Sequence, residues 1–344
     1  MILTERSIAS SIQPGLLWHK KPSRKLLSVA KISAKKTLVV FKILFTLFVL
    51  FFLIERIHLG EIRSAFHHAN FQLILVAAGL LPLNIYCQYK KWETLVRQHV
   101  KAPGKEILLS LLAGFTMGIV TPARLGEYAR VLFIRDNHRI SLVGLTLIDK
   151  LYTLSIVFST GIIAMILYFR TFIHPPFCLL LLFMTTILFF LLYRFLGNPQ
   201  GVKNLLHKTI FENFFSRHKK LKEFVRATDY IEIKTAKTLR TFSLLLVLTF
   251  TFQFNLLIMA FSSIKFTDSL ITAFSILTTK IFFPYAIGDL GVRESIAIFY
   301  LHRYQVVAAA AFDASLLLFL INILIPALLG LVLLLKSRLN GPKL

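Results

Sequence analysis

Long apolar runs constrain the fold of this chain more than any other feature. Six of them carry almost no charge, and they span 37–54, 71–88, 151–169, 176–193, 242–263 and 314–335. Each is long enough for a helix to cross a hydrocarbon core about 30 Å thick at about 1.5 Å per residue. Lipid offers no hydrogen-bond partners, so each run must satisfy its backbone groups internally. The sequence therefore predicts an all-α polytopic membrane protein with six full transmembrane helices.

The distribution of basic residues predicts the orientation of these helices. The net charge is +24, and eight Lys and Arg residues lie in 1–36 while eleven lie in 194–240. Basic residues gather on the cytoplasmic side of a membrane. We therefore expect both termini and the 194–240 loop to be cytoplasmic, in the inner membrane of a cell. A chain that is 56% hydrophobic is not expected to bind nucleic acid despite its charge.

The same pattern divides the chain into segments. We expect a basic cytoplasmic tail over 1–36, because this stretch lacks the short apolar core of a cleavable signal peptide. Two membrane repeats follow, over 37–169 and 170–335, and a second cytoplasmic tail covers 336–344. Within 194–240, aromatic residues near helical spacing alternate with basic ones. This pattern is typical of an amphipathic helix that lies on the anionic inner leaflet.

Two further apolar stretches are too short or too interrupted to cross a membrane. They contain Pro122 and Pro284, and we predict that they form re-entrant hairpins over 107–126 and 269–291. If the first stretch crossed fully, the basic 194–240 loop would lie outside the cell, against the charge rule. Irregular backbone at membrane depth is tolerated only against protein or a water-filled cavity. The alternative is a pair of short, tilted, ordinary helices.

The two hairpins end in similar residues. The first break contains Pro122, Gly126, Glu127 and Arg130 and precedes Asp149, and the second contains Pro284, Gly291, Arg293 and Glu294 and precedes Asp313. Each half has an odd number of crossings, so the second half is inserted upside down relative to the first. The sequence therefore predicts a 3+3 inverted-topology repeat, whose binding site would lie near the membrane midplane.

The residues at the breaks suggest an anion site. Backbone N–H groups freed at a break attract anions, and arginine binds phosphate oxygens through paired hydrogen bonds. The predicted substrate-binding residues are Arg124, Gly126, Glu127, Arg130, Lys280, Gly288, Gly291, Arg293 and Glu294, with Pro122 and Pro284 as structural breaks. The alternative is a set of structural ion pairs without a ligand. Asp149 and Asp313 lie within predicted spans and are candidates either for proton coupling or for structural hydrogen bonds to the hairpins.

Other chemistry has no local signature. The chain contains no GxxxxGK[ST], HExxH or CxxC pattern, so we predict no cofactor, no metal site and no catalytic residue. Cys87 and Cys178 both fall within predicted spans, which favours two buried thiols over a disulfide.

The two break motifs resemble a known family. "TPARLGEYAR" at 121–130 and "IGDLGVRES" at 287–295 are similar to the T-P-G-R-x-G-E and G-G-x-G-x-R-E signatures of the lysylphosphatidylglycerol synthase transmembrane-region family. This is the flippase-like membrane domain of the multiple peptide resistance factor proteins and their stand-alone relatives. The resemblance covers about 40–335, with Ala123 and Asp289 standing where the family commonly has Gly.

The resemblance implies movement of a lipid between leaflets. We expect a lipid translocase that moves an anionic phospholipid or a polyprenyl-phosphate-linked lipid. Its partners would be membrane lipids. We expect transport rather than an enzymatic reaction. The family's synthase members add a C-terminal domain, and we expect no room for it after the last span. One alternative is a membrane-embedded transferase that uses Glu127, Glu294 or Asp149 as a general base. Another is a non-transporting partner of a cell-envelope synthase.

Overall fold

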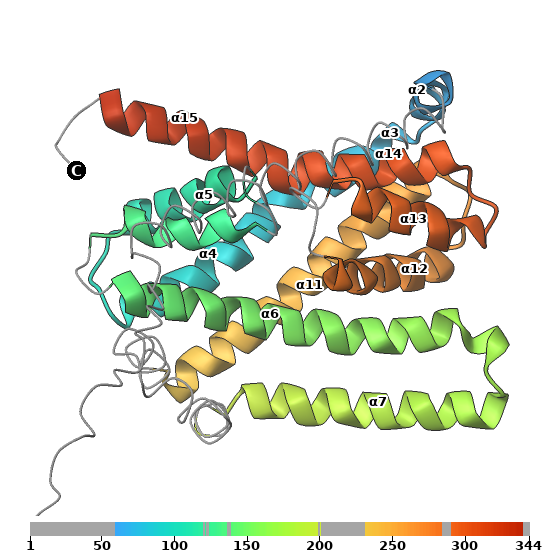
Figure 1. Ribbon diagram of the computed structural model, residues 1–344, viewed down its shortest axis with the longest axis horizontal. Coiled ribbons are helices and arrows are strands. Elements are labelled where there is room, and N and C mark those ends of the chain that lie inside the picture. Colours follow the sequence, from blue (N-terminus) through green and yellow to red (C-terminus); the bar gives the residue numbers. More distant parts are fainter. Residues whose placement is uncertain are drawn as a thin grey trace, which may run out of the picture. The chain divides into compact units, whose positions relative to one another are not determined.

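The computed structural model describes residues 59–119, 121, 124–135, 139–198, 200, 231–283 and 290–339, all of which lie in one compact unit. Every regular element in this part of the chain is a helix (Figure 1). The elements are α2 (Leu59–His67), α3 (Phe71–Gly79), α4 (Leu81–Arg97), α5 (Gly104–Ile119), η1 (Leu125–Phe133), α6 (Arg139–Tyr168), η2 (Arg170–Phe172), α7 (Pro175–Leu196), α11 (Ile233–Phe261), α12 (Phe266–Thr279), η4 (Lys280–Phe282), α13 (Val292–His302), α14 (Ala308–Phe319), η5 (Leu320–Leu324) and α15 (Ile325–Leu339).

Five described helical segments are long and apolar enough to cross a membrane. They are Phe71–Arg97, Ser141–Tyr168, Pro175–Leu196, Ile233–Phe261 and Ala308–Lys336. These segments match five of the six predicted spans, while 37–54 lies outside the described residues. Three helices begin earlier than predicted, α6 at Arg139, α11 at Ile233 and α14 at Ala308. The prediction used charge-free runs, but a helix continues through charged residues when tertiary contacts pair them.

The two short apolar stretches form helices that fold back on themselves. α5 has 16 residues, and the 3₁₀ helix η1 packs back along it. Arg124 at the turn adopts the left-handed region with φ 54°, and a Cβ on Gly126 would overlap the Met117 carbonyl group. α12 has 14 residues, and α13 packs back against it after η4. At about 1.5 Å per residue, both are shorter than a hydrocarbon core.

Each short helix packs against the last long helix of the other half of the chain. Thr116 of α5 donates to the Ala327 carbonyl of α15 at 2.8 Å, and a Cβ on Gly330 would overlap the α5 backbone. Thr278 of α12 donates to a carbonyl of α6 at 3.1 Å, and a Cβ on Gly161 would overlap Thr278. Figure 1 shows α12 beside α6 and α5 beside α15. The short helix of each half therefore packs on the last long helix of the other half, α5 on α15 and α12 on α6.

A buried amide cluster joins α4, α11 and η5. Asn84 donates to Gln253 at 2.7 Å and to Asn322 at 2.8 Å, and Asn322 donates to Gln253 at 2.8 Å. Gln253 in turn donates to the Ala77 carbonyl, close to the break between α3 and α4. Asn322 lies in the π-helical turn η5, where Pro326 has no N–H to offer the carbonyl four residues earlier. The cluster thus fixes two interrupted helices at the centre of the bundle.

α7 differs from the other long helices because few of its side chains are covered by protein. Only Cys178 and Leu196 of this helix are buried, and it packs mainly on α6. Its outward side chains are large and apolar, as Phe183 and Leu188 illustrate with more than half of their surface exposed. Such a surface suits a lipid environment, since lipid tails are as apolar as these side chains.

Candidate functional site

A cavity of about 400 Å³ lies between the helices of both halves. Three cationic side chains line it, namely Arg124 from the turn after α5, Lys150 from α6 and Lys280 from the end of α12. Neutral polar groups from α4, η1, α6, α11 and η5 also face it, and they belong to Gln88, Tyr128, Thr153, Thr251 and Asn322. The rest of the wall is apolar. No carboxylate is among the described residues that line the cavity.

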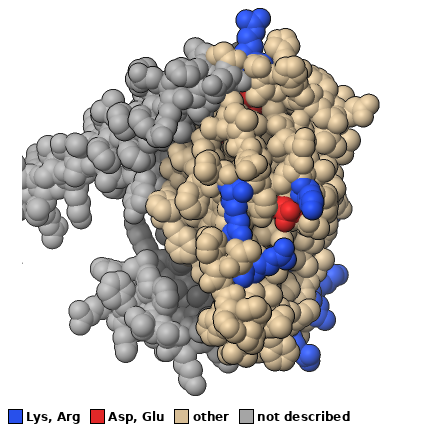
Figure 2. All heavy atoms as spheres, turned by 90° about the vertical axis from the view of Figure 1, so that its right-hand side faces the viewer, with Lys and Arg blue, Asp and Glu red and all other residues tan. Residues whose placement is uncertain are grey.

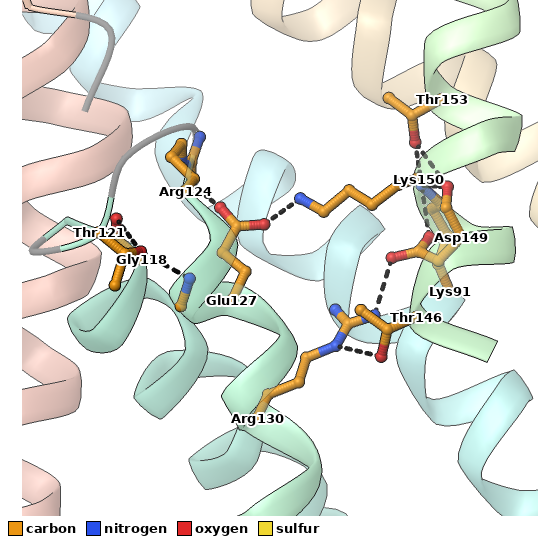
Figure 3. A network of polar contacts seen from close by, with 11 residues as sticks. Lys91, Gly118, Thr121, Arg124, Glu127, Arg130, Thr146, Asp149, Lys150 and Thr153 are labelled. Carbon is orange, nitrogen blue, oxygen red and sulfur yellow. Dashed lines mark hydrogen bonds and ion pairs between the residues drawn. The ribbon is translucent and has the colours of Figure 1, made fainter. Parts of the chain in front are cut away.

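Glu127 holds two of these cations in place from behind the cavity wall (Figure 3). Its carboxylate forms ion pairs with both Arg124 and Lys150, and only 6% of the residue is exposed. Thr121 stabilises the same turn, because its hydroxyl accepts a hydrogen bond from the Gly126 N–H at 2.6 Å. The break after α5 therefore directs Arg124 toward Glu127 and the cavity.

Asp149 anchors a second, deeper set of charges. Its two carboxylate oxygens lie 2.7 Å from Lys91 Nζ and 3.1 Å from Arg130 Nη2. Arg130 also donates to Thr146, and its guanidinium stacks 3.8 Å from the centre of the Trp92 ring. Lys91 and Arg130 are almost fully buried. These residues do not line the cavity but hold α4, η1 and α6 together beside it.

The two sets of charges leave an excess of positive charge. Among the described residues, four cations, Lys91, Arg124, Arg130 and Lys150, are paired with two carboxylates, Glu127 and Asp149, which gives a net charge of +2. Excess charge away from bulk water is costly unless a counter-charge approaches. Arg124 and Lys150 are the members that reach the cavity. The arrangement is therefore suited to binding an anion there.

Arg293 and Glu294 of the second motif form a compact, charge-balanced pair. Arg293 donates to Glu294 at 2.8 Å and to Ser315 of α14 at 2.8 Å, and both charged residues are fully buried. Glu294 also accepts the N–H of Gly291 at 2.6 Å, which caps the start of α13, and Gly291 has φ 82°. These residues are not among those that line the cavity. Gly288, like the breaks Pro122 and Pro284, lies outside the described residues.

Asp313 does not repeat the position of Asp149. It is 2% exposed, its Oδ2 atom has no hydrogen-bond partner among the residues that the structure describes, and no ion pair joins it to Arg293. Arg293 contacts Ser315, and residues two apart point in different directions from a helix. The structure thus brings Arg130 and Asp149 together but does not bring Arg293 and Asp313 together.

Several residues of the site escaped the sequence reasoning. The predicted span 71–88 stops at Gln88, but α4 continues to Arg97 and carries Lys91 as well as Gln88 into the bundle. Lys150 follows Asp149 directly, but adjacent residues on a helix do not face each other, and Lys150 pairs with Glu127. If the predicted helix is extended past residue 88, Gln88 and Lys91 lie on one face, because residues three apart are neighbours on a helix.

These observations define a polytopic, all-helical membrane protein with a cationic cavity between its two halves. The chain belongs to the family described as lysylphosphatidylglycerol synthase TM region, whose model matches residues 39–330. The match confirms the family that the two break motifs predict. No curated protein and no solved structure matches the chain.

Proposed function

We propose that this protein is a lipid translocase that moves an anionic phospholipid or a polyprenyl-phosphate-linked lipid between the leaflets of the inner membrane. The observation that carries the proposal is the cavity of about 400 Å³, into which Arg124 and Lys280 point from the ends of the two short helices. A cavity of this size falls within the range of sites that hold small ligands. The headgroup occupies it, while the acyl or prenyl chains stay in lipid.

The exchanged packing of the short helices supports a 3+3 inverted repeat with two re-entrant hairpins. The Thr116 and Thr278 hydrogen bonds are matching contacts between one half and the other. In such repeats, one half rocks against the other and opens the central site to each side in turn. Cytoplasmic termini complete the proposed topology. Figure 2 shows the face that lies to the right in Figure 1, where several Lys and Arg side chains stand among uncharged ones.

The transferase alternative has less support in the geometry. A general base needs an oxygen within reach of the substrate. Glu127 is buried, bound by two cations and absent from the cavity wall, and Glu294 and Asp149 are held in buried ion pairs. None of these carboxylates faces the space that a headgroup would occupy.

The test is exchange of headgroup-labelled anionic lipids in proteoliposomes that contain the full chain. We expect Arg124→Gln and Lys280→Gln each to slow exchange by about 10-fold or more, the factor associated with one charge-assisted hydrogen bond. Lys105→Gln is the matched control, because Lys105 is exposed on α5 and does not line the cavity. It should exchange lipid at the wild-type rate.

Two results would count against this function. Exchange that is equally fast in the wild type, in Arg124→Gln and in Lys280→Gln would show that the cavity is not the route. Chemical change of the labelled lipid, detected by mass spectrometry after incubation with the wild type, would favour the transferase alternative instead.

A further inference from the structure

We propose that the cavity selects headgroups with two negative charges, such as a phosphomonoester or a diphosphate, over singly charged phosphodiesters. The same site rejects headgroups that carry an ammonium group, including aminoacylated ones. This inference rests on the proposed function and narrows its substrate class.

The first argument is the charge balance beside the cavity. The described residues of the network around Glu127 and Asp149 carry a net charge of +2 without counting Lys280. A singly charged diester would compensate half of this excess, whereas a doubly charged headgroup compensates all of it. Water screens the charges of Lys91 and Arg130 poorly because both side chains are almost fully buried, whereas Arg124 and Lys150 keep 24% and 41% of their side-chain surface exposed. The second negative charge therefore adds to binding here more than it would at an exposed site.

The second argument is the number of hydrogen-bond donors. Arg124 uses Nη2 to bind Glu127, while its Nε is buried and has no hydrogen-bond partner within the described part of the chain. The Lys150 ammonium has three N–H donors, and Glu127 is its ion-pair partner in the network. A phosphomonoester presents three strong acceptor oxygens and a charge between about −1.5 and −2 at pH 7. A diester presents two unbridged oxygens, so it leaves one more donor without a partner.

The third argument concerns headgroups that the cavity should reject. An ethanolamine or lysyl group brings an ammonium beside Arg124, Lys150 and Lys280, and no described carboxylate lines the wall to receive it. Glu127 lies behind the wall and is already paired with two cations. Specificity of this kind depends on repulsion of the wrong ligand as much as on attraction of the right one.

The experiment compares lipids that differ almost only in charge. Phosphatidic acid and its methyl ester, phosphatidylmethanol, carry the same chains and nearly the same headgroup volume, but the ester lacks the second charge. Proteoliposomes of neutral lipid with the full chain would receive trace amounts of each labelled lipid at pH 7.5. Labelled phosphatidylethanolamine and a lysyl-esterified lipid would be assayed beside them, and protein-free vesicles would supply the background rate.

We expect phosphatidic acid to exchange at least about 10-fold faster than phosphatidylmethanol, and the two ammonium-bearing lipids to remain at the background rate. Lys150→Gln should reduce the ratio of the first two rates toward one, and Lys150→Arg should retain it. Lys105→Gln should leave both rates unchanged. The comparison among lipids in the wild type tests the inference even if the Lys150→Gln chain fails to fold.

The outcomes separate this inference from the translocase function. Equal exchange of phosphatidic acid and phosphatidylmethanol, or exchange of the lysyl-esterified lipid above background, would overturn the selection and leave translocation standing. If no lipid exchanges, binding to the detergent-solubilised chain decides the matter, measured as a shift in its thermal unfolding. A shift in unfolding temperature with phosphatidic acid but not with its methyl ester would support the selective binding site and overturn the translocase function. No shift with either lipid would overturn both.

Discussion

Replacing Asp149 by Asn would leave Lys91 and Arg130 buried without their shared carboxylate. The carboxylate oxygens lie 2.7 Å and 3.1 Å from the two cations, and all three side chains are less than 10% exposed. Removing one partner of a buried ion pair costs about 3–5 kcal/mol, mostly because the remaining charge loses its compensation. We expect a loss of free energy of unfolding near the upper end of this range, because two cations lose the same partner.

The assay is unfolding of the purified full chain in mild detergent, titrated with a denaturing detergent and followed by circular dichroism. The informative comparison is the double variant Lys91→Met with Asp149→Asn, which removes one cation together with the carboxylate. Arg130 keeps its contacts with Thr146 and Trp92 in that variant. The double variant should therefore be more stable than Asp149→Asn alone by at least about 1 kcal/mol, as coupled residues show non-additive effects.

Two results would refute the reasoning about this network. One is an Asp149→Asn chain whose free energy of unfolding lies within about 0.5 kcal/mol of wild type, the range expected of ordinary surface substitutions. The other is a double variant no more stable than the single one. Either result would mean that the charges are better hydrated than their burial implies.

Three further substitutions test the remaining parts of the site. Arg293→Met should destabilise the chain by about 3–5 kcal/mol in the same titration, because its carboxylate neighbour stays buried; an unchanged midpoint would contradict the structural role. Gly126→Ala places a Cβ on a backbone carbonyl of α5 and should cost about 1–3 kcal/mol and slow lipid exchange; normal values of both would argue against the close turn. Asn322→Leu removes a hydrogen-bond partner from both Asn84 and Gln253 and should lower the free energy of unfolding by about 1–3 kcal/mol. A chain that is more stable than wild type in thermal unfolding would contradict this.

The spans and the turns were predictable because their causes are local. A long charge-free run forms a helix in lipid whatever its neighbours are, so five predicted spans reappear in the described residues. Likewise, the short length of the apolar stretch before Pro122 was enough to predict that α5 stops, and η1 packs back along α5. The bounds of α6 and α11 were less predictable, since charged residues at their starts are tolerated only where tertiary contacts or interfaces receive them.

The site itself was predictable in part. Arg124 and Lys280 stand out in the sequence because charge at the end of a short apolar helix is unusual, and both line the cavity. Arg130 and Arg293 stand out for the same reason, yet the structure places both in buried ion pairs away from the cavity wall. The position of a cation in the sequence does not reveal whether it lines the cavity or forms a buried ion pair. That outcome depends on which way each helix is rotated when it packs.

By itself, the amino-acid sequence determined the helical membrane class and the family. Hydropathy and backbone chemistry act over neighbouring residues, so they can be read along the chain. Only the tertiary structure decided which cations face the cavity and which are neutralised. Lys91 meets Asp149, and Glu127 meets Lys150, because α4, η1 and α6 pack together. An ion pair forms only when its atoms come within about 4 Å, and helix packing rather than sequence sets that distance.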